Sequence, residues 1–128
     1  MAVAIARSLL ADLLARAAAT PAMEVCGLLF GSDTQIEGAV AAANVADEPS
    51  RRFEIDPAAL FAALRAERAG GPRLIGHYHS HPNGATSPSP CDVAAAEPGR
   101  LWLILAGGEA GLWRATAAGF NAVEMVIR

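Results

Sequence analysis

The stretch LIGHYHSHPNGATSPSPCD, residues 74–92, decides the expected fold because it joins a strand, a proline-rich loop and the start of a helix. Residues 74–81 are predicted to form the strand. The loop after it contains three prolines and a glycine, residue types that let the chain turn back sharply. Asp92 is predicted to begin a short helix, which Pro98 ends. The end of a strand and the start of a helix are therefore expected to lie side by side.

Two histidines of this strand and the aspartate after it form a candidate metal site. His79 and His81 are two positions apart, so in a regular strand their imidazoles leave the same face and can converge on one ion. The loop can return Asp92 to this end of the strand. Two imidazoles and a carboxylate suit Zn²⁺ and leave the fourth tetrahedral position to water, as in catalytic zinc sites. A chance cluster of loop residues is the alternative, but residue type, spacing and strand geometry together favour a metal.

Apolar periodicity and turn residues in the rest of the chain predict an α/β sandwich, with helices against a mixed, mostly antiparallel sheet. One helix is expected over residues 5–17, ending before Pro21. A second is expected over residues 58–69, with Asp56 as N-cap and Pro57 at the first helical position. The remaining predicted strands are residues 25–30 and 36–45 as a hairpin, 51–55 as an extension of that sheet, and 101–105, 112–118 and 122–127 as a closing antiparallel meander.

Length and hydropathy indicate one domain over residues 1–128, without a membrane span. The mean hydropathy is +0.31, but no apolar run approaches the ~18 residues that a spanning helix needs. The N-terminal segment is rich in Leu and Ala like a signal peptide, yet Arg7, Asp12 and Arg16 interrupt it, so a helix is expected instead.

Cysteine and charge content bear on compartment and partners. Only Cys26 and Cys91 are present, which predicts no disulfide framework and favours a reducing, cytoplasmic setting. The net charge is −3, and the ten basic residues are scattered along the chain, so no nucleic-acid footprint is expected. All ten are arginine, and the absence of lysine excludes Schiff-base chemistry.

The carboxylate of Glu24 could be the proton carrier that hydrolysis at such a metal site requires. Glu24 directly precedes the apolar residues 25–29, which places it at the margin of the predicted core. Taken alone, it is more simply interpreted as a solvated charge at the end of a strand.

Together these residues resemble the motif of the JAMM (MPN-plus, Mov34) metalloproteases. The motif positions, all filled here, are Glu24, His79-Ser80-His81-Pro82, Ser89 after six more residues and Asp92 after another two. The similarity also includes residues 24–29, 53–57 and 76–82, so it covers most of the chain. It is similar above all to the short, stand-alone prokaryotic members.

The resemblance implies a fold and a mechanism. The fold would be the single-domain JAMM/MPN sandwich, which is like that of cytidine deaminases. His79, His81 and Asp92 would bind zinc with water as fourth ligand, and Glu24 would act as general base and acid. Ser89 would stabilise the oxyanion of a tetrahedral intermediate. By itself, Ser89 between two prolines would be read as a turn or helix-capping serine.

The resemblance also implies a substrate class. Such proteins hydrolyse the amide or isopeptide bond after the C-terminal Gly-Gly tail of a ubiquitin-like protein, and bacterial ones process ubiquitin-like sulfur carriers. We expect such a tail to pair with a sheet edge near the zinc. The chain has little room for the insertions that select linked ubiquitin chains.

Three other functions are weighed against this one. A non-catalytic MPN interaction module would be expected to lack metal ligands, which this chain keeps. A zinc deaminase needs His-x-Glu and Pro-Cys-x-x-Cys, but no second cysteine follows Pro90-Cys91. A RadC-like DNA-repair-associated protein would share His-x-His-Pro and Ser-x-x-Asp, and Glu24 with Cys26-Gly27 points away from it.

Some roles stay open at this level. His77 is interpreted as a satisfied, partly buried histidine, with second-shell support of the metal or substrate contact as the alternative. Cys91 is a small loop residue or, alternatively, a soft ligand or reactive thiol. Asn44 is a turn residue or a substrate-facing amide. The sequence does not indicate the oligomeric state.

Overall fold

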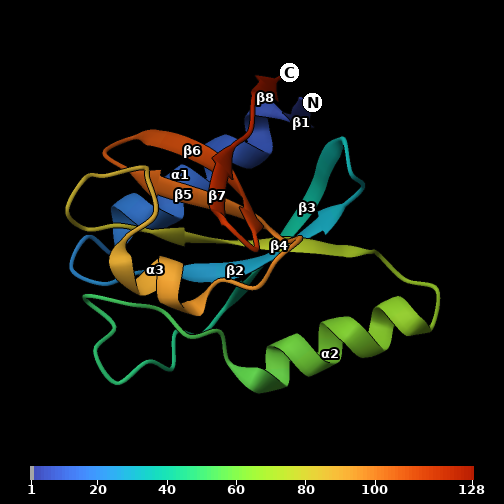
Figure 1. Ribbon diagram of the computed structural model, residues 1–128, viewed down its shortest axis with the longest axis horizontal. Coiled ribbons are helices and arrows are strands. Elements are labelled where there is room, and N and C mark those ends of the chain that lie inside the picture. The colour runs from blue at the N-terminus through green and yellow to red at the C-terminus, as the bar shows by residue number, and fades with distance from the viewer. Residues whose placement is uncertain (1) are drawn as a thin grey trace.

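An eight-stranded sheet organises the computed structural model, which describes residues 2–128 (Figure 1). In space the strands follow the order β7-β6-β5-β4-β2-β3-β1-β8. Four of the seven pairings are antiparallel and three are parallel, which confirms the mixed α/β class. The strands are β1 (Val3–Ile5), β2 (Cys26–Gly31), β3 (Gln35–Ala42), β4 (Leu74–Ser80), β5 (Leu101–Ala106), β6 (Glu109–Thr116), β7 (Gly119–Ala122) and β8 (Met125–Ile127). The helices are α1 (Arg7–Ala19), α2 (Pro57–Arg68) and α3 (Pro90–Ala95).

The histidine-bearing strand β4 lies in the middle of the sheet. It pairs antiparallel with β2 and parallel with β5, so Cys26 and Ile104 flank His79 on its two sides. At Gly76 the sheet leaves no room for a side chain, because an added Cβ would clash with the Leu101 backbone. Strand β4 is thus paired with β2 as far as His79 and with β5 as far as Ser80.

Helices α1 and α2 cover opposite faces of this sheet. Leu10 and Leu13 of α1 pack into the larger apolar cluster together with Tyr78 of β4. On the other face, Ala63 of α2 packs against Leu28 and Leu74 in a smaller cluster. The arrangement confirms the predicted sandwich, and α3 lies at the end of the sheet where β4 stops (Figure 1). No helix within residues 2–128 has the length and apolarity to span a bilayer.

The predicted helices are largely confirmed, and their ends follow local chemistry. The side chain of Asp56 accepts a hydrogen bond from Ala58 N at 3.1 Å, so it caps α2 as expected, with Pro57 as the first helical residue. Helix α3 begins at Pro90, two residues before the predicted start at Asp92.

Three predicted segments differ from the structure, and two of them lie near the ends of the chain. Ile5, expected in the first helix, belongs to β1, a wholly buried strand that pairs in parallel with β3 and β8. Residues 122–127 do not form one strand of the meander, because β7 ends at Ala122 and β8 crosses to β1. Residues 51–55 do not extend the sheet beyond one isolated bridge between Asn44 and Ile55. Ile5 fits the helical spacing of the residues that follow it, but it pairs as a strand with residues far away in the sequence. A short local pattern does not reveal such pairing.

Candidate metal centre and active site

Four buried side chains converge where β4 ends: Glu24, His79, His81 and Asp92. Their ligand atoms all lie within 4.8 Å of one another. The two Nε2 atoms of the histidines are 3.0 Å apart, and Asp92 Oδ2 lies 3.1 Å from His79 Nε2 and 3.0 Å from His81 Nε2. Ligands of a tetrahedral zinc with bonds of ~2.0–2.1 Å lie about 3.3 Å apart, so this triangle has the size of a zinc site.

Three separate elements bring these groups together. His79 is the penultimate residue of β4, and His81 follows the strand, which ends one residue before the predicted 74–81. The first turn of α3 supplies Asp92, and the residues just before β2 supply Glu24. The structure thus places all four predicted residues at one point, although they are up to 68 positions apart in the chain.

The donor chemistry of the cluster fits zinc. His81 Nδ1 lies 2.7 Å from the carbonyl of Ala85, which can only accept, so Nδ1 carries the proton and Nε2 keeps its lone pair for a metal. The buried Oε1 of Glu24 has no hydrogen-bond partner within residues 2–128. A cation, or a water held by one, would satisfy such a buried carboxylate oxygen.

Burial and mutual charge shift the pKa values of the cluster, and one shift opposes metal binding: burial lowers the pKa of His81, but Asp92 and the Ala85 carbonyl outweigh it and raise the pKa. Burial raises the pKa of Glu24 to about 7, against the opposing influence of His81. Burial also lowers the pKa of His79, which favours the neutral imidazole that binds metals. For Asp92, burial alone would raise the pKa, but the adjacent imidazoles of His79 and His81 and the Ser89 N–H outweigh it, so the pKa is lowered and the carboxyl stays ionised.

Ser89 occupies the N-cap of α3 and forms a capping box with Asp92. Its Oγ accepts from Asp92 N at 3.1 Å, and its own N–H donates to Asp92 Oδ2 at 2.9 Å. The capping interpretation of Ser89 therefore holds. It leaves the hydroxyl proton free, since Oγ is only an acceptor in this bond, so a second role as donor remains open to it.

Two polar residues that the sequence did not assign to the site hold Glu24 in place. Ser80 Oγ accepts from Val25 N at 2.9 Å, and Ser80 N donates to Val25 O at 3.0 Å. These two bonds attach the residue after Glu24 to the end of β4. Asn44 Nδ2 donates to Glu24 O at 2.9 Å. The position of Ser80 between two ligand histidines was the available sequence signal, and Asn44 was noted only as a polar residue ending an apolar run.

Asn44 is saturated with backbone hydrogen bonds and does not face a substrate. Besides Glu24 O, its Nδ2 donates to Arg52 O at 3.0 Å, and its Oδ1 accepts from Ala46 N at 3.0 Å and Glu54 N at 3.1 Å. The turn interpretation is confirmed and the substrate-facing alternative is wrong, because all its polar atoms are engaged within the chain.

Aromatic rings cover one side of His79. Phe53 stacks on the His79 imidazole with ring centroids 4.2 Å apart and an interplanar angle of 20°. His77 meets Trp102 edge-on at 4.3 Å. His77 is partly buried as predicted, but its Nδ1 has no hydrogen-bond partner within residues 2–128, so the expectation of a satisfied histidine is wrong. Burial lowers its pKa to about 3, which keeps the ring neutral.

The two cysteines lie in different environments. Cys26 is buried in β2, as expected of a core residue, and burial raises the pKa of its thiol to about 11. Cys91 is exposed in the first turn of α3. Its sulfur is not among the four ligand groups of the cluster.

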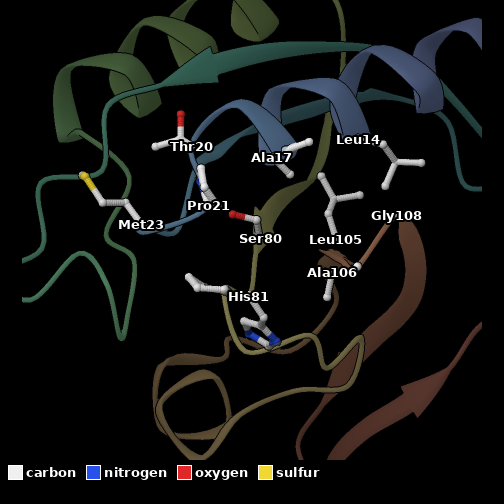
Figure 2. A pocket seen from close by; sticks show the side chains of 13 residues that line it. Leu14, Ala17, Thr20, Pro21, Met23, Ser80, His81, Leu105, Ala106 and Gly108 are labelled. Carbon is white, nitrogen blue, oxygen red and sulfur yellow. The ribbon is translucent and has the colours of Figure 1, made fainter.

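Two clefts open beside the metal centre. The first, here called the α1 cleft, has a volume of about 220 Å³ and lies between the end of α1 and the ends of β4 and β5 (Figure 2). The second, here called the α3 cleft, has a volume of about 270 Å³ and lies between α3 and the segment at Arg52 and Phe53. His81 lines the first and Asp92 the second, so the metal centre separates them.

Comparisons of the sequence show related proteins of stated activity. A desampylase of Haloferax volcanii is 41% identical over 91 residues, which are 69% of this chain and 66% of that protein. A probable TtuB-protein conjugate cleaving protease of Thermus thermophilus is 37% identical over 68 residues, which are 53% of this chain and 46% of that protein. The chain thus spans less than two thirds of either relative.

Solved structures share the fold over the whole chain. Protein DSY2949 of Desulfitobacterium hafniense superposes with a TM-score of 0.84 at 25% identity, covering 100% of this chain and 93% of that one. AF2198, a JAB1/MPN domain protein of Archaeoglobus fulgidus, superposes with a TM-score of 0.67 at 19% identity, covering 99% and 98%. The sandwich with β4 at its centre is therefore the JAB1/MPN fold.

A family match agrees with this fold and with the buried Glu-His-His-Asp cluster. The family described as prokaryotic homologs of the JAB domain matches residues 6–118, which include every residue of the cluster. With most of the chain matched, the fold shared and the motif residues assembled in space, this chain belongs to the prokaryotic JAB-domain family.

Proposed function

We propose that this chain is a zinc metallopeptidase of the JAMM type, which hydrolyses the amide bond after the C-terminal Gly-Gly of a ubiquitin-like protein. The buried cluster of Glu24, His79, His81 and Asp92 carries the proposal, since it combines a zinc-sized ligand triangle with an adjacent carboxylate. The similarity to a desampylase and to a probable TtuB-protein conjugate cleaving protease supports a ubiquitin-like partner. More specifically, we propose that this ubiquitin-like protein is a sulfur carrier.

Zinc bound by His79, His81 and Asp92 would lower the pKa of a coordinated water and polarise the scissile carbonyl. Glu24 has a pKa near 7, so it can hold a proton at neutral pH and release it again. It takes a proton from water and delivers it to the nitrogen of the leaving amine. Its fixed backbone, held by Ser80 and Asn44, keeps this carboxylate beside the ligands throughout.

Ser89 is proposed to stabilise the oxyanion. Its hydroxyl proton is free while Oγ accepts from Asp92 N, and its place at the start of α3 brings it next to the ligand Asp92. A donor positioned before the reaction begins stabilises developing charge without reorganisation.

The rival functions fit this site less well. An interaction module has no need of four buried ionisable groups with an unpartnered carboxylate oxygen, because burying them costs stability. A DNA-associated role would be expected to need a cluster of basic residues, whereas the net charge of this chain is −3 and its arginines are scattered along the sequence. We further propose that residues 1–128 act as one domain and that the two free cysteines suit the cytoplasm.

The test is intact-mass analysis of zinc-loaded protein with ubiquitin-like sulfur carriers extended beyond Gly-Gly. Wild type should remove the extension, while Glu24→Gln should keep zinc and lose about 10²-fold or more in rate, because the proton carrier is gone. Glu37→Gln is the matched control, an exposed glutamate of β3 outside the site. Cleavage by Glu24→Gln at the wild-type rate would refute the role of Glu24. A zinc-bound wild type that cleaves no ubiquitin-like extension or conjugate would refute the proposed activity.

A further inference from the structure

The end of the sheet opposite the metal centre holds a cavity that no step of the proposed reaction uses. Strand β4 starts there and ends at the metal centre, beside α3 (Figure 1). Strand β2 is antiparallel to β4, with Phe30 opposite Leu74 and Cys26 opposite His79, so the end of β2 also lies at this side. The cavity has a volume of about 160 Å³, and its polar side chains are those of Ser32, Asp33, Glu67, Arg73, Arg100 and Arg114.

Three of the ten arginines of the chain line this cavity, and they come from different parts of the sheet. Arg73 directly precedes β4, Arg100 directly precedes β5, and Arg114 lies in β6. Backbone carbonyls hold the two half-buried ones: Arg100 Nη1 donates to Leu74 O at 2.6 Å, and Arg114 Nη1 donates to Gly99 O at 3.3 Å. A guanidinium has five N–H donors, so each of these bonds leaves further donors free for a ligand.

The carboxylates of the cavity do not balance its positive charge. Asp33 Oδ1 accepts from Arg73 Nη2 at 3.0 Å, but these side chains are 70% and 57% exposed, and an ion pair so exposed is weak. Glu67 Oε1 accepts from the first backbone N–H of β4 at 3.2 Å. Within residues 2–128, no carboxylate oxygen lies within 4.0 Å of the guanidinium nitrogens of Arg100 or Arg114. Three guanidiniums against two carboxylates leave the lining side chains with a formal charge of +1.

The size and the donors of the cavity suit a phosphate group. Its volume is roughly five times the ~30 Å³ that one water occupies in the liquid, which is room for a small anion. A tetrahedral oxyanion can accept from guanidiniums on several sides, whereas the two oxygens of a carboxylate lie in one plane and match one guanidinium fork. Beyond Asp33 and Arg114, which line both spaces, an open depression of about 500 Å³ continues along residues 121–123. The organic part of a phosphate ester would have room there.

We propose that this cavity binds a phosphate group, as inorganic phosphate or as the end of a small phosphomonoester, with Arg100 and Arg114 as its main donors. The site shares no residue with the metal centre, so it does not depend on the proposed peptidase activity. The bound group would join the start of β5 to β6, and Arg100 already joins it to the start of β4 through the Leu74 carbonyl. Binding should therefore raise the thermal stability of the chain.

Isothermal titration calorimetry of the zinc-loaded protein with inorganic phosphate and with glycerol phosphate tests the site. The ionic strength is held constant, because salt screens exposed charges. Wild type should bind at a ratio of one ligand to one chain. Arg114→Gln should raise Kd about tenfold or more, because charge-assisted hydrogen bonds to the anion are lost. The matched control is Arg7→Gln, which removes an exposed arginine that does not line the cavity and should bind like wild type.

A second variant tests the same site in the opposite direction. Asp33→Asn removes an exposed negative charge from the lining and frees Arg73, so Kd should fall severalfold. Asp12→Asn, at an exposed position of α1 away from the cavity, is its control. Because Asp33 is exposed, this variant should fold and still decides if Arg114→Gln does not.

The zinc itself is the competing place for phosphate to bind, and His81→Ala separates the two. This variant should lose the metal but bind phosphate with the Kd of wild type, since the cavity lies at the other end of β4. Loss of binding in His81→Ala, equal Kd values in Arg114→Gln and Arg7→Gln, or no binding of either ligand to wild type would overturn the inference. Tighter binding of glycerol phosphate would identify an ester as the ligand, and tighter binding of inorganic phosphate would identify the free ion. None of these results bears on the peptidase.

Discussion

Asn44 organises the surroundings of Glu24 through its side-chain amide. Its four hydrogen bonds join the segment before β2 to the loop between β3 and α2. Glu24 is buried beside His79, His81 and Asp92, and its Oε1 has no hydrogen-bond partner within residues 2–128, so its position depends on how its backbone is held. Asn44 supplies that restraint from a position 20 residues further along the chain.

We predict that Asn44→Ala lowers the free energy of unfolding by about 2–3 kcal/mol, because several backbone groups lose their partner. The activity of the folded variant should fall through kcat while zinc stays bound, since Glu24 shifts and the ligands do not. Urea unfolding and zinc content measure the two effects. Asn121→Ala, at an exposed residue of β7, is the control. A stability equal to that control would contradict the restraint.

His77 illustrates how burial of an imidazole links stability to pH. Its folded pKa of about 3 lies below the unfolded value of ~6.5, so the unfolded state binds the extra proton between these limits. Its contribution to stability is therefore present above ~pH 6.5 and is lost as the pH falls towards 3. Besides burial, the ionisable groups of His79, Asp92 and Arg100 influence its pKa: His79 and Arg100 lower it and Asp92 raises it.

We predict that the metal-free protein loses stability as the pH falls from about 6.5 to 4.5, and that His77→Phe reduces this slope by at most about 1.4 kcal/mol per pH unit. Phenylalanine keeps the packing against Trp102 and removes the titration. Urea unfolding in a chelator at three pH values gives both slopes. Parallel slopes for wild type and variant would show that the folded protein protonates His77.

At the scale of elements, the end of β4 and the first turn of α3 act as one unit. The two histidines come from the strand and Asp92 from the helix, while the Ser89–Asp92 capping box fixes where the helix starts. The same hydrogen bonds that cap α3 therefore aim Asp92 at the histidines. A helix of six residues has little stability of its own, so its cap and its tertiary contacts decide its place.

We predict that Ser89→Ala has two separable effects. Loss of the N-cap should cost about 1 kcal/mol of stability. Loss of the oxyanion donor should lower kcat about 10²–10³-fold with zinc retained. Thermal unfolding and steady-state kinetics distinguish them, and Ser89→Thr should restore both, because its hydroxyl caps and donates. A loss of stability with unchanged kcat would leave Ser89 a capping residue alone.

At the scale of the whole molecule, the fold gives the metal centre two different sides. Helices α1 and α2 lie on opposite faces of the sheet, and β4 carries Tyr78 towards α1 and His79 away from it. The cluster at the strand end is thus bordered by the α1 cleft on one side and by the α3 cleft, with Arg52 and Phe53, on the other.

Much of the site could be predicted from local sequence. The spacing of His79 and His81 places both imidazoles on one strand face, and Asp56-Pro57 marks a helix start, because both patterns act over a few residues. The prediction of a helix at Ile5 was wrong because a helical period is also a local pattern. It carries no information about the pairing of β1 with β3 and β8.

Local sequence was enough to indicate the candidate metal-binding side chains, the start of α2 and the strand that carries the histidines. The position of Glu24 beside His81, the hydrogen bond from Asn44 to its backbone, the pairing of β8 with β1 and the cleft next to the cluster depend on the tertiary fold. The first group depends on interactions between residues a few positions apart, which the periods of helix and strand record. The second depends on contacts across tens of residues, which form only when the sheet has assembled its strands in their spatial order.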